Sequence, residues 1–280
     1  MARPYYLVDV FGTAPFTGNP LAVVGDAEGL TTEEMQAIAR WFNLSETTFL
    51  LHPTDPAADY RVRIFTPVHE LPFAGHPTLG SAHAWQARGI QTKRVNLITQ
   101  ECGAGLVTVR RDQDRLAFVG PPLVRSGRPT EAELAEVLKV LQIDSTQIVD
   151  AAWADNGPGW IAVLLDSADA VLAIQPSRYY PGSIDVGVVG PYPPSSEVAF
   201  ELRAIHYDAQ GTLIEDPVTG SLNASVAEWL FATGRATGDY VAAQGTVLDR
   251  TGRIYVTRDE ESKIWVGGRT LTVVEGELGL

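Results

Sequence analysis

Short apolar runs, many of them rich in branched and aromatic residues, follow one another along the whole chain. Runs of about four to eight such residues, bounded by Gly, Pro, Asn, Asp or Ser, are typical of β-strands. The pattern therefore predicts many strands and few helices. In the first half we expect strands at residues 5–10, 21–24, 47–51, 60–65, 95–99, 106–109 and 116–119. In the second half we expect them at 148–153, 160–165, 186–189, 198–205, 240–243, 254–257, 264–266 and 270–274.

Two segments have the pattern of capped helices. Residues 32–42 take Thr31 or Thr32 as the N-cap, and the first turn is acidic, which the helix dipole favours. Residues 131–141 follow a stretch rich in Gly and Pro at 120–129, which is typical of a linker. The sequence thus predicts two domains, 1–122 and 123–280, with the option that the last strand, about 269–280, returns to the first domain.

The two halves also repeat a pattern. In each half a strand-like run leads through a loop to a glycine, then to a helical stretch with a tryptophan, and then to a second glycine. These glycines are Gly75 and Gly89 in the first half and Gly220 and Gly234 in the second, so both spans are fourteen residues. A rival register, which aligns residues 76–81 with 216–221, matches a local motif but not the helix length. Two glycine-led helix starts could bind an anion through their backbone N–H groups.

Composition limits the choice of ligand. The chain has 280 residues, of which 45% are hydrophobic and 20% charged, as in globular proteins that fold around a core without disulfides or metals. The formal net charge is -13, and no run of Lys or Arg offsets it. Nucleic acid would be repelled and is excluded as a partner. A small acidic substrate would have to be bound by local hydrogen-bond donors.

The cysteine count and the apolar segments indicate where the protein is located. Cys102 is the only cysteine, so no intrachain disulfide can form, as expected in a reducing cytoplasm. The first residues lack the apolar stretch of a signal peptide. The most apolar segment, 160–174, is interrupted by Asp166 and Asp169, so it is too short and too charged for a membrane span. We expect a cytoplasmic protein without a membrane partner.

Glu46 is the first candidate for chemistry, because it lies between the predicted helix and an apolar strand. Its neighbours Leu44, Phe49 and Leu50 predict a partly desolvated carboxylate. Desolvation raises a carboxyl pKa toward neutrality, which is what a general acid/base needs. The alternative is that Glu46 is a solvated residue at the start of a strand.

His76 is the second candidate, in the sequence Gly75-His76-Pro77. Proline suits a first helical turn, and glycine lets the backbone approach a ligand closely. A histidine at this point could donate a hydrogen bond or exchange a proton. Alternatively, it caps its own helix or packs in the core.

Asp216, Gly220 and Ser221 belong to the richest polar stretch, residues 215–225. Two carboxylates, hydroxyl groups and a glycine precede a predicted helix there. A helix N-cap needs only one such side chain, so the excess of polar groups favours a binding site. An ordinary Asp-Pro turn is the alternative.

Other chemistries fit less well. His69-Glu70 begins like a zinc motif, but Phe73 occupies the position of the second histidine, so we expect no metal. Cys102 has no recognisable catalytic partner. Neither a dinucleotide fingerprint nor a phosphate-binding loop is present in the sequence.

Taken together, these motifs resemble the phenazine-biosynthesis-like (PhzF-like) family. The matching pieces are Asp9-Val-Phe with Gly18-Asn-Pro20, Asn43-Leu-Ser-Glu-Thr47, residues 65–77, residues 215–221 and Gln244-Gly245. The resemblance implies a diaminopimelate-epimerase type of α+β fold. In that fold two similar domains, each a β-barrel-like sheet around a central helix, form the active site in the cleft between them.

The resemblance also implies roles for the candidates. Glu46 would move the proton, with His76 and Asp216 as its polar partners. Gly75, Gly220 and Ser221 would bind the substrate, and neither metal nor cofactor would be needed. The paired cysteines of amino-acid epimerases with this fold are absent. Residues 156–160 and 222–225 differ from the phenazine enzymes, so their substrate does not carry over.

The sequence therefore predicts a cofactor-independent isomerase that acts on a small carboxylic or amino acid, as a cytoplasmic homodimer. One alternative is an epimerase that acts at a single carbon. The other is a binding protein that kept the fold and lost turnover.

Overall fold

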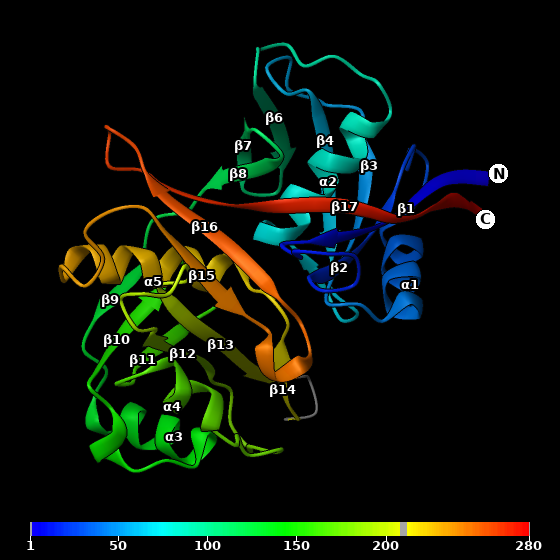
Figure 1. Ribbon diagram of the computed structural model, residues 1–280. Coiled ribbons are helices and arrows are strands. Elements are labelled where there is room, and N and C mark those ends of the chain that lie inside the picture. Colours follow the sequence, from blue (N-terminus) through cyan, green and yellow to red (C-terminus); the bar gives the residue numbers. More distant parts are fainter. Residues whose placement is uncertain (1, 208–211, 280) are drawn as a thin grey trace. The chain divides into compact units, whose positions relative to one another are not determined.

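The computed structural model describes residues 2–207 and 212–279, which form an α+β structure (Figure 1). The predicted α+β class is confirmed. Contacts divide the chain into two compact units: the first consists of Met1–Val119 with Gly267–Leu280, and the second of Gly120–Val266. The domain boundaries predicted from the sequence, at residues 122 and 123, stay a prediction. Within the described ranges, no helix is long and apolar enough to cross a membrane.

The strands of the first unit pair in a ring that closes on itself. The order is β17, β1, β2, β3, β4, β6, β7 and β8, and β8 pairs with β17 again. The β2–β3 and β4–β6 pairs are parallel. The bounds are β1 (Ala2–Val10), β2 (Asn19–Val24), β3 (Thr47–Leu51), β4 (Tyr60–Phe65), β5 (Glu70–Leu71), β6 (Leu97–Cys102), β7 (Gly105–Asp112), β8 (Arg115–Val119) and β17 (Ile264–Gly279).

Helix α2 (Gly75–Ala87) lies inside this ring and contacts β1, β2, β3, β4, β6, β7 and β8. A helix enclosed on all sides cannot keep a polar face, and α2 is buried along most of its length. Its small residues allow close packing, since a Cβ on Gly80 would lie 2.5 Å from Leu21 Cδ2. Helix α1 (Thr32–Phe42) packs elsewhere in the unit, with Met35 and Ala39 in a core that includes Phe49.

The second unit has the pairing order β9, β10, β11, β12, β13, β15 and β16, with the short β14 also paired to β13. Helices α3 and α4 belong to this unit, and α5 packs against β10 and β16. The bounds are β9 (Arg125–Gly127), α3 (Glu131–Leu141), β10 (Asp150–Asp155), β11 (Trp160–Leu164), α4 (Ala168–Ala173), β12 (Asp185–Pro191), β13 (Phe200–Tyr207), β14 (Leu213–Asp216), α5 (Gly220–Ala232), β15 (Tyr240–Gln244) and β16 (Gly252–Arg258); 3-10 turns span Ser145–Gln147 and Thr246–Leu248.

Each unit repeats one order of elements. An antiparallel strand pair is followed by a parallel third strand, an antiparallel fourth, a short fifth, the buried helix, and a sixth strand parallel to the fourth. The helices start at Gly75 and Gly220 and have 13 residues each. Gly89 and Gly234 follow them with φ of 74° and 70°. The register that aligns Gly75 with Gly220 is thus confirmed, and the rival register is wrong.

Some elements differ from those predicted. Residues 264–279 form one strand of 16 residues where two short strands were expected. The glycines at 267 and 268 interrupt the apolar pattern, but the extended backbone continues because it pairs with β1. The short strands β5, β9 and β14 were not predicted, because they have two to four residues and none contains an apolar run of more than two. Helix α4 was not predicted because its 6 residues are too few to show a helical period.

A substitution of Gly190 on β12 tests how tightly the second unit is packed. A Cβ there would collide with the backbone carbonyl of Ser167, the N-cap of α4. We expect Gly190→Ala to lower the free energy of unfolding by about 1–3 kcal/mol, measured by urea denaturation. Gly238→Ala is the matched control, because nothing lies within 4 Å of its Cβ position, and it should change stability by less than about 0.5 kcal/mol. Equal effects of the two changes would contradict this packing.

Candidate active site

Glu46 lies in the segment between α1 and β3. Helix α1 ends at Asn43, whose backbone is left-handed with φ 52°, and the chain then enters the buried strand that starts at Thr47. The Glu46 side chain is 16% exposed, and its Oε2 lies 3.3 Å from Nε2 of His76. The carboxylate is therefore in direct contact with the first turn of α2, and the alternative of a solvated strand start is wrong.

His76 is a buried, neutral histidine. Its side chain is 5% exposed, and burial lowers its pKa to about 3. A neutral imidazole carries one proton, on either Nδ1 or Nε2. The Nδ2 amide of Asn19 lies 3.4 Å from His76 Nδ1 and can donate to it. The proton of the ring is then on Nε2, which faces the Glu46 carboxylate.

Asn19 is held in place by Asp9. Asp9 is buried, and its Oδ2 and Oδ1 accept hydrogen bonds from the backbone N–H groups of Thr17 (2.9 Å) and Gly18 (2.8 Å). A Cβ on Gly18 would collide with the Val10 carbonyl and with Asp9, so only glycine fits. The loop that contains Thr17 and Gly18 therefore places Asn19 at the start of β2. Sequence reasoning quoted Asp9 and Asn19 within a motif but assigned them no role.

The second group of candidates surrounds the start of α5. Asp216 ends β14, and its Oδ2 accepts a hydrogen bond of 2.6 Å from Thr219 Oγ1. The buried Gln244 ties this loop to the helix: its Oε1 accepts from Thr219 N–H (3.0 Å) and Asn223 Nδ2 (2.8 Å). Its Nε2 donates to the Asp216 carbonyl at 3.1 Å. Gln244 is a positioning residue whose role the sequence did not indicate.

The first unit uses a glutamine in the same way. Gln100 on β6 is buried, and its Nε2 donates to Thr78 Oγ1 at 3.0 Å. The Thr78 hydroxyl donates in turn to the Ala74 carbonyl at 2.9 Å. Thr78 is the fourth residue of α2, as Asn223 is of α5. A buried glutamine on the strand after each helix thus fixes both glycine-led helix starts.

Ser221 is oriented by two side chains of its own unit. Trp160 Nε1 donates to Ser221 Oγ at 3.2 Å, and Asn156 Nδ2 donates to the Ser221 carbonyl at 3.0 Å. An indole N–H can only donate, so Ser221 Oγ accepts this bond. The Ser221 hydroxyl proton can then be donated to a ligand.

The structure thus brings some of the predicted residues together. Glu46, His76 and Gly75 meet at the start of α2; Asp216, Gly220 and Ser221 lie at the start of α5. That these residues form the site stays a prediction. In the part of the chain that the structure describes, no group of three His, Cys, Asp or Glu could hold a metal.

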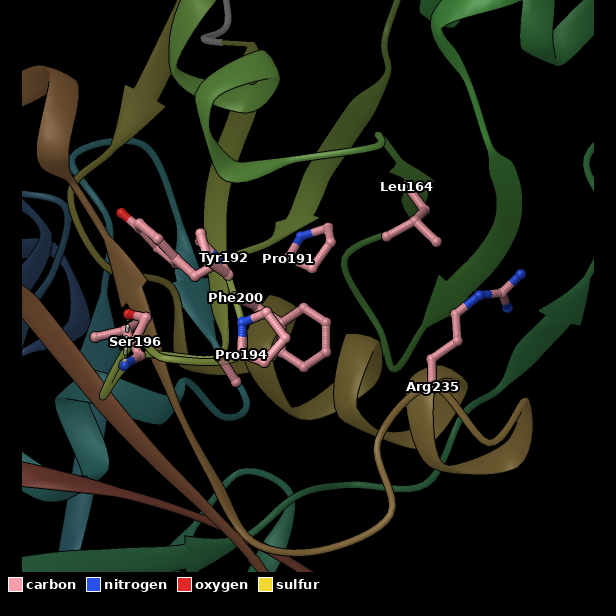
Figure 2. Close-up of a pocket in the computed structure, with 10 residues that line it drawn as sticks. Leu164, Pro191, Tyr192, Pro194, Ser196, Phe200 and Arg235 are labelled. Atoms are coloured by element: carbon pink, nitrogen blue, oxygen red, sulfur yellow. Dashed lines mark hydrogen bonds between the residues drawn. The ribbon is translucent and has the colours of Figure 1, made fainter.

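A cavity of about 450 Å³ on the second unit is lined by none of these candidates. Figure 2 shows its prolines, Tyr192 and Phe200, with Arg235 beside them. The Tyr192 hydroxyl donates to Glu201 at 2.8 Å, and burial raises the pKa of Tyr192 to about 12. Arg235 is paired with Asp150 at 2.8 Å. These groups are engaged within the protein and are poorly suited to proton transfer. The cavity is lined by Leu164, Pro191, Tyr192, Pro193, Pro194, Ser196, Val198, Ala199, Phe200 and Arg235.

Comparison with known proteins supports the class that this fold indicates. A family model described as phenazine biosynthesis-like protein matches residues 8–276. The chain therefore belongs to the phenazine biosynthesis-like (PhzC-PhzF) family, as the motifs predicted. Relatives that align with nearly the whole chain are named isomerases, so the prediction of an isomerase is confirmed.

Three similar proteins show how far the likeness extends. Antisense-enhancing sequence 1 of Schizosaccharomyces pombe is 35% identical and covers 96% of both chains. Trans-2,3-dihydro-3-hydroxyanthranilate isomerase of Pseudomonas chlororaphis is 32% identical over 99% of both chains. The crystal structure of a PhzF-family protein of Enterococcus faecalis has a TM-score of 0.81 at 26% identity and covers all of both chains.

The neutral state of His76 predicts a pH dependence of stability. Its pKa is about 3 in the folded protein and about 6.5 when unfolded, so between these values the unfolded chain binds more protons. Stability should therefore fall as the pH drops below about 6.5, by up to about 1.4 kcal/mol per pH unit from this group. His76→Gln should remove that part of the slope in urea titrations between pH 7 and 5. The same slope in both proteins would contradict a buried neutral His76.

Proposed function

We propose that this family member is an isomerase that moves a proton on a small carboxylic or amino acid without a metal or organic cofactor. Glu46 is the acid/base. The observation that carries this proposal is the contact of 3.3 Å between the Glu46 carboxylate and the buried His76. A carboxylate in such a place can accept a proton from carbon and give it back.

His76 supports Glu46 because it does not compete for the proton. Burial lowers the pKa of His76 to about 3, so the ring stays neutral after Glu46 has taken a proton. Its Nε2–H faces the Glu46 carboxylate and can donate a hydrogen bond to a polar group of the substrate. Glu46 therefore keeps the proton until the substrate takes it back at another position.

The helix starts provide the donors for an acidic substrate. Gly75 and Gly220 begin two buried helices without a side-chain cap, and their backbone N–H groups suit a carboxylate. Ser221 can donate its hydroxyl proton, and Asp216 can bind an amine or a hydroxyl group. We propose that helix starts of this kind bind the carboxylate of the substrate. The cytoplasmic location and the homodimer stay predictions.

The name of the Pseudomonas chlororaphis relative indicates the class of substrate. It refers to trans-2,3-dihydro-3-hydroxyanthranilate, a small cyclic amino acid. A compound of that class has both a carboxylate for the helix starts and an amine for Asp216. An epimerase that acts at a single carbon would use the same Glu46 and is the second candidate. The shift of a double bond in the product distinguishes isomerisation from epimerisation.

Glu46→Gln tests the proposal, because it keeps the shape of the side chain and removes the exchangeable proton. With trans-2,3-dihydro-3-hydroxyanthranilate and a panel of cyclic amino acids, turnover followed by proton NMR should fall at least ~10²–10⁴-fold. Glu197→Gln, at an exposed glutamate of the second unit, is the matched control and should keep full turnover. Near-normal turnover by Glu46→Gln would remove Glu46 from the mechanism.

A further inference from the structure

Arg203 on β13 binds Glu215 on β14 through two parallel hydrogen bonds. Its Nε donates to Glu215 Oε1 at 3.0 Å, and its Nη2 donates to Oε2 at 2.7 Å. The two side chains are 5% and 12% exposed, so this ion pair is buried. The remaining nitrogen, Nη1, donates to the carbonyls of Val171 (3.1 Å) and Ile174 (2.7 Å) at the end of α4. The guanidinium group is therefore fixed in place, and it fixes the glutamate in turn.

Glu215 and Asp216 are neighbours on β14, so their side chains point to opposite faces of the strand. Glu215 faces Arg203 and the end of α4. Asp216 faces the start of α5, because its Oδ2 accepts a hydrogen bond of 2.6 Å from Thr219, the N-cap of that helix. One of two adjacent carboxylates thus lies at the start of α5, and the register of β14 decides which one.

The apolar residues of β14 do not select this register. The strand has four residues, and they pair with β13. Leu213 packs against a core that includes residues of α3 and α4, whereas Ile214 is 42% exposed. A slip by one residue would exchange the faces of these two aliphatic side chains, which differ little in the apolar area they can bury. The same slip would bring Asp216 to Arg203 in place of Glu215.

The buried guanidinium group selects between the two registers. Glu215 is longer than Asp216 by one methylene group, and it forms both of the parallel bonds that an arginine offers. The slip would also break the bond from Thr219 to Asp216, and the bond of 3.1 Å from Gln244 Nε2 to the Asp216 carbonyl. Without Glu215 the balance changes, because a buried guanidinium group that has lost its carboxylate destabilises a protein more than the loss of a neutral hydrogen bond.

The first unit contains the same ion pair without a second carboxylate beside it. Arg63 on β4 donates through Nε (2.7 Å) and Nη2 (2.6 Å) to the two carboxylate oxygens of Glu70 on β5. Glu70 lies five residues before the start of α2, as Glu215 lies five residues before the start of α5. The residue after Glu70 is Leu71, where the second unit has Asp216. The ion pair is thus part of the duplicated framework, and the aspartate is particular to the second unit.

We propose that Arg203 and Glu215 are positioning residues, whose buried ion pair sets the register of β14 and so places Asp216 at the start of α5, where it binds the amine or hydroxyl group of the substrate. The part of this inference that concerns the substrate rests on the proposed function. The part that concerns the register rests on contacts within the second unit alone.

Glu215→Met tests the proposal, because it keeps the length of the side chain and removes both acceptor oxygens. Asp216 should then pair with Arg203 and leave the start of α5. We expect KM for trans-2,3-dihydro-3-hydroxyanthranilate to rise ~10–100-fold, the effect of losing a hydrogen bond to a charged group, with a smaller change in kcat. A merely structural role of the pair would reduce the fraction of active protein, which lowers the apparent kcat at an unchanged KM.

The double variant Arg203→Met/Glu215→Met separates these roles further. It replaces the ion pair with two apolar side chains of similar length, so no buried cation remains at this place to attract Asp216. KM should therefore return toward the value of the wild type. A KM that stays as high in the double variant as in Glu215→Met would overturn the proposal.

Glu70→Met is the matched control in the first unit. It breaks the equivalent ion pair, whose side chains are 25% and 37% exposed, and the Leu71 beside it cannot pair with Arg63. We expect KM to stay within about twofold of the wild type, because partly exposed ion pairs contribute little. An equal rise of KM in Glu70→Met and Glu215→Met would contradict a specific role of Asp216.

The register itself can be measured without a substrate, by nuclear Overhauser effects between protons of β13 and β14. The wild type and the double variant should place Asp216 opposite Ala204, and Glu215→Met should place it opposite Ile205. If Glu215→Met does not fold, Glu215→Gln, which keeps one acceptor oxygen, takes its place. Asp216 opposite Ala204 in the folded single variant would overturn the inference. If the wild type turned over none of the compounds, the proposed function would fail, and the register would still decide what the ion pair does.

Discussion

The buried contact between His76 and Glu46 is the interaction on which the account of this protein depends. Burial keeps the imidazole neutral, and a neutral ring carries one proton, on either Nδ1 or Nε2. Asn19 can donate to Nδ1, which leaves the proton on Nε2 beside the carboxylate. Asp9 and Gly18 hold the loop that presents Asn19. A chain of short-range hydrogen bonds thus sets the tautomer of the ring that contacts Glu46, the proposed acid/base.

The duplicated architecture explains why the candidate residues lie at two helix starts. In each unit the buried helix begins at a glycine without a side-chain cap, and a buried glutamine fixes its fourth residue. The backbone framework is the same, but the side chains on it differ. The first unit has the pair Glu46 and His76. At the position of His76 the second unit has Ser221, whose hydroxyl oxygen accepts a hydrogen bond from Trp160.

Sequence patterns predicted the parts that depend on neighbours along the chain. The fourteen-residue spans to Gly89 and Gly234 revealed the repeat, because helix length is a local property. Glu46 and His76 were found because motifs surround them. Gln244 could not be assigned a role in this way, because its partners are 21 to 28 residues away and only strand register brings it to a helix start. Asn19 lies 57 residues from His76.

The tautomer of His76 tests the central claim most directly. Nitrogen NMR of the folded wild-type protein, labelled with ¹⁵N in histidine, distinguishes protonated from unprotonated ring nitrogens at neutral pH. We predict a neutral His76 ring with the proton on Nε2 and an unprotonated Nδ1 that accepts from Asn19. In Asn19→Leu, which removes this donor, the preference for Nε2 should weaken. A His76 that is a cation at pH 7, or that carries its proton on Nδ1, would contradict the account.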